Sequence, residues 1–220
     1  MDGSQSANDR AIFRCVSTAT ATTKGAATRE AIVERAYEIA RFSGVEGLSI
    51  GPLAQAVGMS KSGVFAHFGS REDLQLAVLE HAARCFGEAV FIPALSHPRG
   101  LPRLRAVMHN WFDWVRGNTG GCVLLGSVTE FDDRPGPLHD QVLRNEQRWQ
   151  DILRGAIQLA VDEGHLRTGD VDQYAFELYA IPLMVHHKAG LFGYEHARAR
   201  GEQAVERWFA ANSANSPLTR

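Results

Sequence analysis

The chain has 220 residues, a length that suits one or two domains and allows a sizeable apolar core. Apolar residues make up 45% of it and charged residues 22%, which is ordinary for a soluble globular protein. Its net charge of −2 excludes a protein that binds polyanions over its whole surface, so any nucleic-acid interface must be local.

The three cysteines, Cys15, Cys85 and Cys122, are far apart in the sequence and form no CxxC pair. This usage indicates a reduced, cytoplasmic protein. The first residues lack an apolar stretch after a basic start, so no signal peptide is expected. No apolar run reaches the ~18 residues that a membrane span needs.

Residues 1–26 are rich in Ser, Thr and Ala without a sustained period, and we expect them to form a disordered, modestly basic arm. Thr28 is predicted to cap the first helix and Gly44 to end it. Apolar residues recur between them at three- and four-residue spacing, which predicts one buried stripe. The stripe consists of Ile32, Val33, Ala36, Ile39 and Ala40.

The most specific pattern is residues 49–68, Ser-Ile-Gly-Pro-Leu-Ala-Gln-Ala-Val-Gly-Met-Ser-Lys-Ser-Gly-Val-Phe-Ala-His-Phe. Ser49 and Ser60 are predicted N-caps of two short helices. Ala54 is small enough for the helices to cross closely, and Gly58 can adopt the positive φ of a tight turn. Leu53, Val57, Met59 and Val64 supply apolar contacts between them. The pattern predicts a helix-turn-helix whose second helix projects outward and fits a major groove.

In this arrangement Lys61 can pair with phosphate, and nearby hydroxyls can reach phosphates or base edges. The exposed start and flank of the second helix carry Ser60, Lys61, Ser62, Phe65 and His67. A helical hairpin without any ligand has the same pattern of small turn residues and apolar flanks, so this segment alone leaves that alternative open.

Ser70 is predicted to cap the next helix, with Asp73 as an acidic capping-box partner. No strand alternation is present anywhere. Further helices are expected at about 101–116, 122–131, 138–163, 171–190 and 195–212. The predicted fold class is all-α, with a three-helix helix-turn-helix domain (27–72), a six-helix ligand-binding and dimerisation domain (73–213) and a tail (214–220).

The region of about residues 28–78 resembles the DNA-binding domain of the tetracycline-repressor (TetR) family. The resemblance rests on Thr28-Arg29-Glu30, on the stretch from Gly44 to Ser49, and on Gly58-Met-Ser-Lys-Ser-Gly-Val-Phe-Ala-His-Phe-Gly-Ser-Arg-Glu-Asp-Leu74. The long C-terminal helices resemble, by architecture, the family's ligand-binding and dimerisation part. The resemblance implies a ligand-responsive transcriptional regulator, with repression by operator occupancy as the usual mode.

The resemblance also implies a set of DNA contacts. Arg29 would approach a phosphate, and Ser49 would present its hydroxyl and nearby N–H groups to the backbone. Lys61 and Ser62 would lie in the groove, while His67 and Arg71 would hold flanking phosphates. The complete set is Arg29, Ser49, Ser60, Lys61, Ser62, Phe65, His67 and Arg71. This chain has Phe65 where the family usually has a tyrosine, so that ring can touch a thymine methyl but lacks a hydroxyl for phosphate.

Positive and negative side chains balance over residues 28–72, so DNA binding must depend on a few placed contacts. Arg10, Arg14 and Lys24 of the N-terminal arm could add to them. A solvated arm with no such role is an equally good interpretation.

A regulator of this kind would bind a small, largely apolar or aromatic effector in its helical body. Candidate pocket residues, each of which could equally be core, are Met108, Trp111, Phe112, Cys122, Leu125, Phe131, Trp149, Tyr179, Met184 and His186. The helices at 171–190 and 195–212 have more apolar surface than one side can bury, which predicts a homodimer. Two recognition helices per dimer then predict a near-palindromic operator.

Other chemistry has weaker support. His81 and Cys85 have the spacing of two metal ligands on one helix face, but no third ligand is evident, so no metal or other cofactor is expected. Glu130, Asp132 and Asp133 adjoin a loop and are interpreted as surface charge. No catalytic motif is present, and the chain is not expected to be an enzyme. A helical small-molecule carrier or enzyme with a merely structural N-terminal region, and a protein-interaction module, remain the alternatives.

Overall fold

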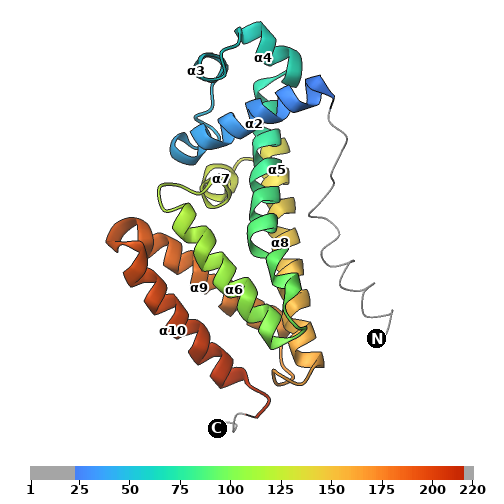
Figure 1. Ribbon diagram of the computed structural model, residues 1–220, viewed down its shortest axis with the longest axis vertical. Coiled ribbons are helices and arrows are strands. Elements are labelled where there is room, and N and C mark those ends of the chain that lie inside the picture. Colours follow the sequence, from blue (N-terminus) through green and yellow to red (C-terminus); the bar gives the residue numbers. More distant parts are fainter. Residues whose placement is uncertain (1–22, 216–220) are drawn as a thin grey trace. The chain divides into compact units, whose positions relative to one another are not determined.

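The computed structural model describes residues 23–215, so most of the predicted arm and tail, with Cys15, lies outside the described residues. Within this range nine α-helices and one short 3₁₀ helix make up the fold, which confirms the all-α prediction (Figure 1). Extended pairing there is limited to one isolated bridge between Leu166 and Ser213. The helices are α2 (Lys24–Ser43), α3 (Ile50–Ala56), α4 (Lys61–Phe68), α5 (Arg71–Val90), η1 (Pro93–Ser96), α6 (Leu101–Gly117), α7 (Val123–Phe131), α8 (Pro137–Asp162), α9 (Val171–Phe192) and α10 (Tyr194–Asn212).

The described residues divide into two compact units. The N-terminal unit, residues 23–85 and 120–147, holds α2 to α4, most of α5, α7 and the first turns of α8. The C-terminal unit, residues 86–119 and 148–215, holds η1, α6, α9, α10 and the remaining turns of α5 and α8. The segment predicted to bind DNA therefore lies wholly within the N-terminal unit, and α7 joins that unit from much later in the chain. None of the helices between residues 23 and 215 is long and apolar enough to cross a membrane.

Helix α2 begins one turn earlier than the sequence predicts. Thr23, not Thr28, is its N-cap, and the Thr23 hydroxyl oxygen accepts a hydrogen bond from the Ala26 N–H at 3.2 Å. Thr28 lies inside the helix, where its hydroxyl donates to the Lys24 carbonyl at 3.0 Å. The prediction was wrong because residues 24–27 are exposed and carry no apolar stripe. The predicted end is confirmed, since Gly44 has a φ of 74° and stops the helix.

The geometry of the helix-turn-helix confirms the sequence prediction. Gly58, between α3 and α4, has a φ of 67°, which a residue with a side chain rarely adopts. The Ser60 hydroxyl caps α4 by accepting the Gly63 N–H at 3.1 Å. Leu53 and Val64 are fully buried where the two helices pack together. The exposed residues of α4 are thus held outward by a small, well-packed core.

The start of α5 differs in detail from a capping box. The Ser70 hydroxyl accepts the Asp73 N–H at 3.0 Å and donates to the Asp73 carboxylate at 2.6 Å. The Ser70 N–H is bonded to the Phe68 carbonyl at 2.8 Å and so does not reach the carboxylate. Ser70 and Asp73 still form a closed pair at this helix start, as the sequence indicated.

In the C-terminal unit, α9 and α10 pack side by side and both contact α6 (Figure 1). The close approach depends on Gly201 of α10. A Cβ at this position would overlap the Val185 Cγ2 atom of α9 and stand 3.1 Å from the Phe112 ring of α6. Any larger residue at position 201 would therefore push three helices apart.

We expect Gly201→Ala to destabilise the protein by about 1–3 kcal/mol, the usual cost of overpacking a filled core. Val185 and the Phe112 ring are both buried and have little room to move. Gly117→Ala is the matched control, because a Cβ at Gly117 meets no atom within 4 Å. Urea denaturation followed by circular dichroism measures both variants. Equal stability of the Gly201 variant and the wild type would contradict the packing described.

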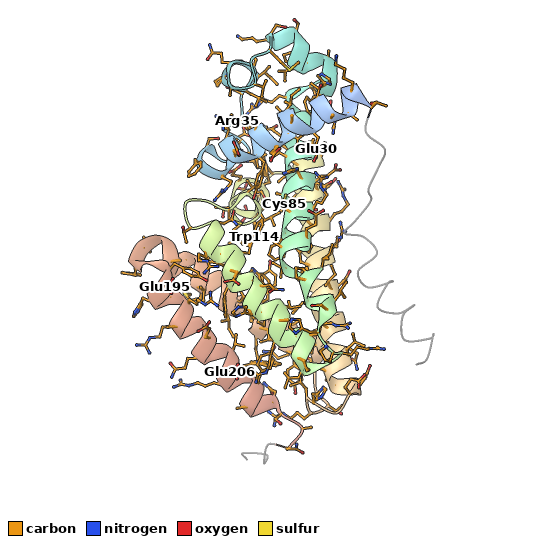
Figure 2. The ribbon with its side chains drawn as sticks, viewed as in Figure 1. Glu30, Arg35, Cys85, Trp114, Glu195 and Glu206 are labelled. Carbon is orange, nitrogen blue, oxygen red and sulfur yellow. The ribbon has the colours of Figure 1, made fainter. Side chains whose placement is uncertain are left out.

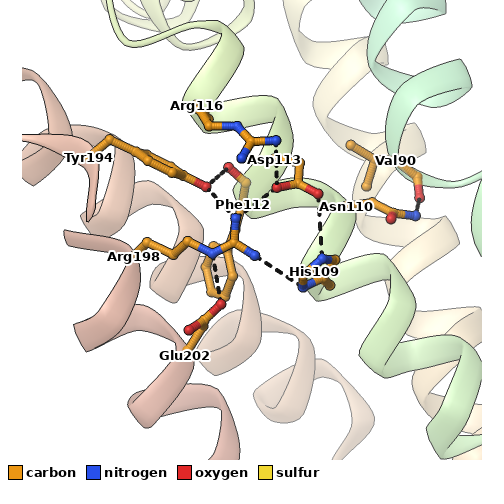
Figure 3. A network of polar contacts seen from close by, with 9 residues as sticks. All are labelled: Val90, His109, Asn110, Phe112, Asp113, Arg116, Tyr194, Arg198 and Glu202. Carbon is orange, nitrogen blue, oxygen red and sulfur yellow. Dashed lines mark hydrogen bonds and ion pairs between the residues drawn. The ribbon is translucent and has the colours of Figure 1, made fainter. Parts of the chain in front are cut away.

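A polar network joins α10 to α6 (Figure 3). The Arg198 guanidinium bonds the Asp113 carboxylate at 2.8 Å and the Glu202 carboxylate at 2.7 Å. The Tyr194 hydroxyl donates to the Phe112 carbonyl at 2.9 Å, and burial raises the pKa of Tyr194, so that the phenol keeps its proton. These bonds fix the register of α10 along α6.

Candidate nucleic-acid interface

Helix α4 presents a cation, a hydroxyl and an aromatic ring to solvent. Lys61 and Ser62 in its first turn are exposed, and Phe65 is 42% exposed one turn later. The opposite face, with Val64 and Phe68, is buried. A helix whose exposed first turns carry such groups can enter the major groove of DNA. Base edges and phosphates there offer hydrogen-bond acceptors, and thymine offers a methyl group.

The serines on either side of Lys61 have different surroundings. The Ser60 hydroxyl is engaged in capping α4 and lies 3.0 Å from the Ser62 hydroxyl. Lys61 reaches back towards α3, where its Cε and Nζ would stand 3.3 and 3.6 Å from a Cβ on Gly51. The ammonium group therefore lies beside the start of both helices of the motif, and a side chain at Gly51 would crowd it.

Two further cationic candidates lie beside the Phe68 ring at the end of α4. The Arg29 guanidinium carbon is 4.8 Å from the ring centroid, within cation–π range. The His67 ring centroid is 6.5 Å from that of Phe68. Arg29 is exposed and His67 half-buried, so both keep surface available on the N-terminal unit.

Arg71 and Ser49 differ from the role predicted for them in one respect each. The Arg71 guanidinium donates to the Leu48 carbonyl at 2.8 Å and to the Glu46 carbonyl, and so holds the α2–α3 loop. The residue is nevertheless exposed. Ser49 occupies the N-cap position of α3, but its side chain makes no capping bond. None of the eight predicted DNA-binding residues is buried, and all belong to the N-terminal unit.

The predicted effector-binding residues are divided between the two units. Cys122, Leu125 and Phe131 belong to the N-terminal unit. The C-terminal unit holds Met108, Trp111, Phe112, Trp149, Tyr179, Met184 and His186.

Several of those in the C-terminal unit belong to an aromatic cluster around Phe86, a residue that the sequence reasoning missed. The Phe86 ring packs edge-on against Trp149 at 4.8 Å and Trp111 at 5.3 Å between centroids. Trp111 in turn meets Tyr179 edge-on at 5.2 Å. The buried Trp149 indole N–H has no hydrogen-bond acceptor among the described residues. Phe86 is one of several apolar residues on α5, and nothing in its local sequence marks it as the centre of a cluster.

The other predicted pocket residues have three different settings. Met108 and Phe112 line a small hollow of about 260 Å³ between α6 and α10. Met184 is 55% exposed and lines an open groove of about 620 Å³ along α9 and α10, not an interior pocket. His186 donates from Nε2 to the Asn118 carbonyl at 3.3 Å, and burial lowers the pKa of its imidazole.

The pair suggested as metal ligands belongs to a polar cluster between α2 and α5. The Cys85 sulfur lies 3.3 Å from His81 Nε2, and His81 Nδ1 lies 3.3 Å from the Glu30 carboxylate. Figure 2 labels Glu30 and Cys85 on their two helices. Among the described residues no group of three or more His, Cys, Asp or Glu side chains is arranged to hold a metal ion.

Glu130 corrects an interpretation from the sequence. It is not a solvated surface charge, because its carboxylate accepts hydrogen bonds from the backbone N–H groups of Val45 and Glu46, at 3.2 and 2.8 Å. These partners lie more than eighty residues earlier in the chain. No local sequence signal could have identified them.

Comparison with known proteins agrees with this geometry. Residues 26–78 match the model described as bacterial regulatory proteins of the tetR family, and residues 100–205 match the tetracyclin repressor-like C-terminal domain. No curated protein matches the sequence.

Solved structures of regulators have the same fold. A TetR transcriptional regulator from Chloroflexus aurantiacus is 26% identical, with a TM-score of 0.74 over 84% of this chain and 96% of that one. One from Streptomyces coelicolor is 23% identical, with a TM-score of 0.74 over 83% and 95%. AibR, solved in complex with isovaleryl coenzyme A and operator DNA, is 24% identical, with a TM-score of 0.64 over 80% and 97%.

Both parts of the described fold therefore have counterparts in one family. The helix-turn-helix lies within the N-terminal match, and α6 to α9 lie within the C-terminal match. Members of this family are DNA-binding transcription regulators with a ligand-binding domain, and not enzymes. The chain belongs to the TetR family of bacterial transcriptional regulators.

Proposed function

We propose that the chain is a ligand-responsive repressor that binds a near-palindromic operator as a homodimer and is released by a small, largely apolar effector. The observation that carries the DNA-binding part is the outward face of α4, where Lys61, Ser62 and Phe65 are exposed above the buried Val64. In this proposal residues 27–72 contact DNA, and residues 73–213 bind the effector and form the dimer.

The predicted DNA contacts have distinct tasks in this proposal. Lys61, Ser62 and Phe65 face the groove, and Arg29, Ser49 and His67 contact flanking phosphates. Ser60 acts mainly by capping α4, since its hydroxyl is already engaged. Arg71 holds the loop before α3 and offers its remaining donors to phosphate.

The exposed apolar surface of α9 and α10 supports the homodimer. The groove between these helices is lined largely by apolar residues, among them Ile181, Met184 and Phe192. Phe176 and Leu191 of α9 are also 72% and 66% exposed. Soluble monomers rarely leave so much contiguous apolar surface in water, whereas a second copy of the pair would cover it.

The aromatic cluster of the C-terminal unit supports an apolar effector. Aromatic rings supply apolar contact area, and the unpaired Trp149 indole N–H could donate to one acceptor on the ligand. AibR was solved in complex with isovaleryl coenzyme A and operator DNA, so that protein of the same fold binds both a small molecule and DNA. A calorimetric screen in which only small charged metabolites bind this chain would contradict an apolar effector.

Selection from a random DNA library with the full chain tests the operator. We expect enrichment of a near-palindrome whose half-sites lie about 34–36 Å apart, or a multiple of this. Absence of any enriched sequence at moderate salt would favour the alternative of a helical carrier with a non-functional DNA-binding domain.

A further inference from the structure

The loop between α2 and α3, residues 44–49, is held at two of its N–H groups by a side chain of α7. Glu130 accepts the Val45 N–H with Oε1 at 3.2 Å and the Glu46 N–H with Oε2 at 2.8 Å. Each carboxylate oxygen thus takes one of two successive backbone donors, and a carboxylate makes stronger hydrogen bonds than a neutral acceptor.

The same loop is held at its carbonyl groups by two side chains of α5. Gln75, which is only 4% exposed, donates to the Val45 carbonyl at 2.8 Å. Arg71 donates to the Leu48 carbonyl at 2.8 Å and to the Glu46 carbonyl. Val45 and Glu46 are therefore bonded at both their N–H and C=O groups, by side chains from two helices.

The backbone around this loop is shaped for the carboxylate. Gly44 has a φ of 74°, and a Cβ there would overlap Glu130 Oε1. Val45 and Leu48 are fully buried and anchor the loop from the inside. Gly44, the buried Gln75 amide and the two buried apolar residues therefore hold the loop in the conformation that Glu130 binds.

We infer that Glu130 is a positioning residue for operator binding, an inference that rests on the proposed function. By fixing the loop that leads directly into α3, its carboxylate sets how α3 and α4 stand on α2, α5 and α7 within the N-terminal unit. Because α7 lies in the part that matches the C-terminal family model, Glu130 also ties that part of the sequence to the loop before the helix-turn-helix.

Three variants separate geometry from charge. Glu130→Gln removes the charge and turns one acceptor into a donor, whereas Glu130→Asp keeps the charge but shortens the side chain by one methylene. Asp133→Asn is the matched control, since the Asp133 side chain is 85% exposed and its ion pair with Arg134 is 4.0 Å long. The measurements are fluorescence anisotropy with the selected operator and with a duplex of unrelated sequence, both at one salt concentration.

We expect Glu130→Gln and Glu130→Asp to lower operator affinity about tenfold and to leave affinity for the unrelated duplex within about twofold. Non-specific binding depends on charge and tolerates a displaced recognition helix, whereas base contacts do not. Asp133→Asn leaves both affinities unchanged. Equal operator affinity of wild type and both Glu130 variants overturns the inference, and a wild type that binds no operator overturns the proposed function instead.

Amide hydrogen exchange tests the contact in the absence of DNA. Because single amides are compared within one protein, a change in overall stability is told apart from loss of this contact. The Val45 and Glu46 amides are expected to exchange at least tenfold faster in Glu130→Gln than in wild type. The Gly44 amide, which donates to the Ala40 carbonyl at 2.9 Å, serves as the internal control and stays unchanged. Equal exchange of Val45 and Glu46 in both proteins overturns the inference.

Discussion

Met184→Glu is expected to convert the dimer to monomers and to lower operator affinity at least ~100-fold. Met184 lies on the apolar groove of α9 and α10, with Ile181 and Val185 beside it. A carboxylate there would lose its water in the dimer interface, and although Lys188 lies one turn away on α9, burying a charged pair costs more than burying the methionine it replaces. A 100-fold loss of operator affinity corresponds to about 3 kcal/mol. Sedimentation velocity at micromolar concentration measures the change.

Leu143→Glu is the matched control for this variant. Leu143 is also an exposed hydrophobic residue, at 46%, but it lies on α8 in the N-terminal unit. The same exchange there is expected to leave the dimer and its operator affinity intact. If Met184→Glu remained dimeric while Leu143→Glu dissociated, the dimer would have to form through another surface.

Lys61→Ala is expected to weaken operator binding by about 1–3 kcal/mol for each recognition helix, and so at least tenfold for the dimer. The N-terminal domain has no excess of positive charge over residues 28–72, so each placed cation matters more than on a broad basic surface. Anisotropy titrations over a series of salt concentrations also report the salt slope, which is expected to become shallower because Lys61 is a cation whose contact with DNA releases counterions.

Arg144→Ala provides the comparison for Lys61→Ala. Arg144 is exposed on α8 in the same unit, and its guanidinium donates to the neighbouring Gln141 side chain at 2.8 Å. Arg144→Ala removes the same charge as Lys61→Ala but leaves the helix-turn-helix unchanged, so operator affinity is expected to stay within about twofold. Equal losses in the two variants would mean that net charge, and not the placement of Lys61, controls binding.

Features fixed by local backbone chemistry could be predicted from the sequence. Gly44 and Gly58 adopt the positive φ expected at a helix end and a tight turn, and Ser60 caps α4 as predicted. The start of α2 was misplaced because its first turn is exposed, and an exposed turn has no apolar period to detect. Its cap, Thr23, lies within a run of threonines and alanines that offers several equivalent candidates.

Features that depend on distant parts of the chain could not be predicted. The partners of Glu130 are backbone N–H groups, which every residue carries, so no side-chain pattern marks them. Met184 and Phe112 are both apolar residues of predicted helices, yet one lines an exposed groove and the other is buried. Periodicity identifies an apolar face but not what covers it, and this is why the predicted effector residues remain a proposal.

Native mass spectrometry of the full chain mixed with its selected duplex tests the central claim most directly. The expected result is a complex of two chains on one near-palindromic duplex. A duplex with only one half-site is expected to bind the chain far more weakly. A stable complex of one chain per operator, or an operator duplex that remains unbound at moderate salt, would contradict the claim that this chain is a dimeric DNA-binding regulator.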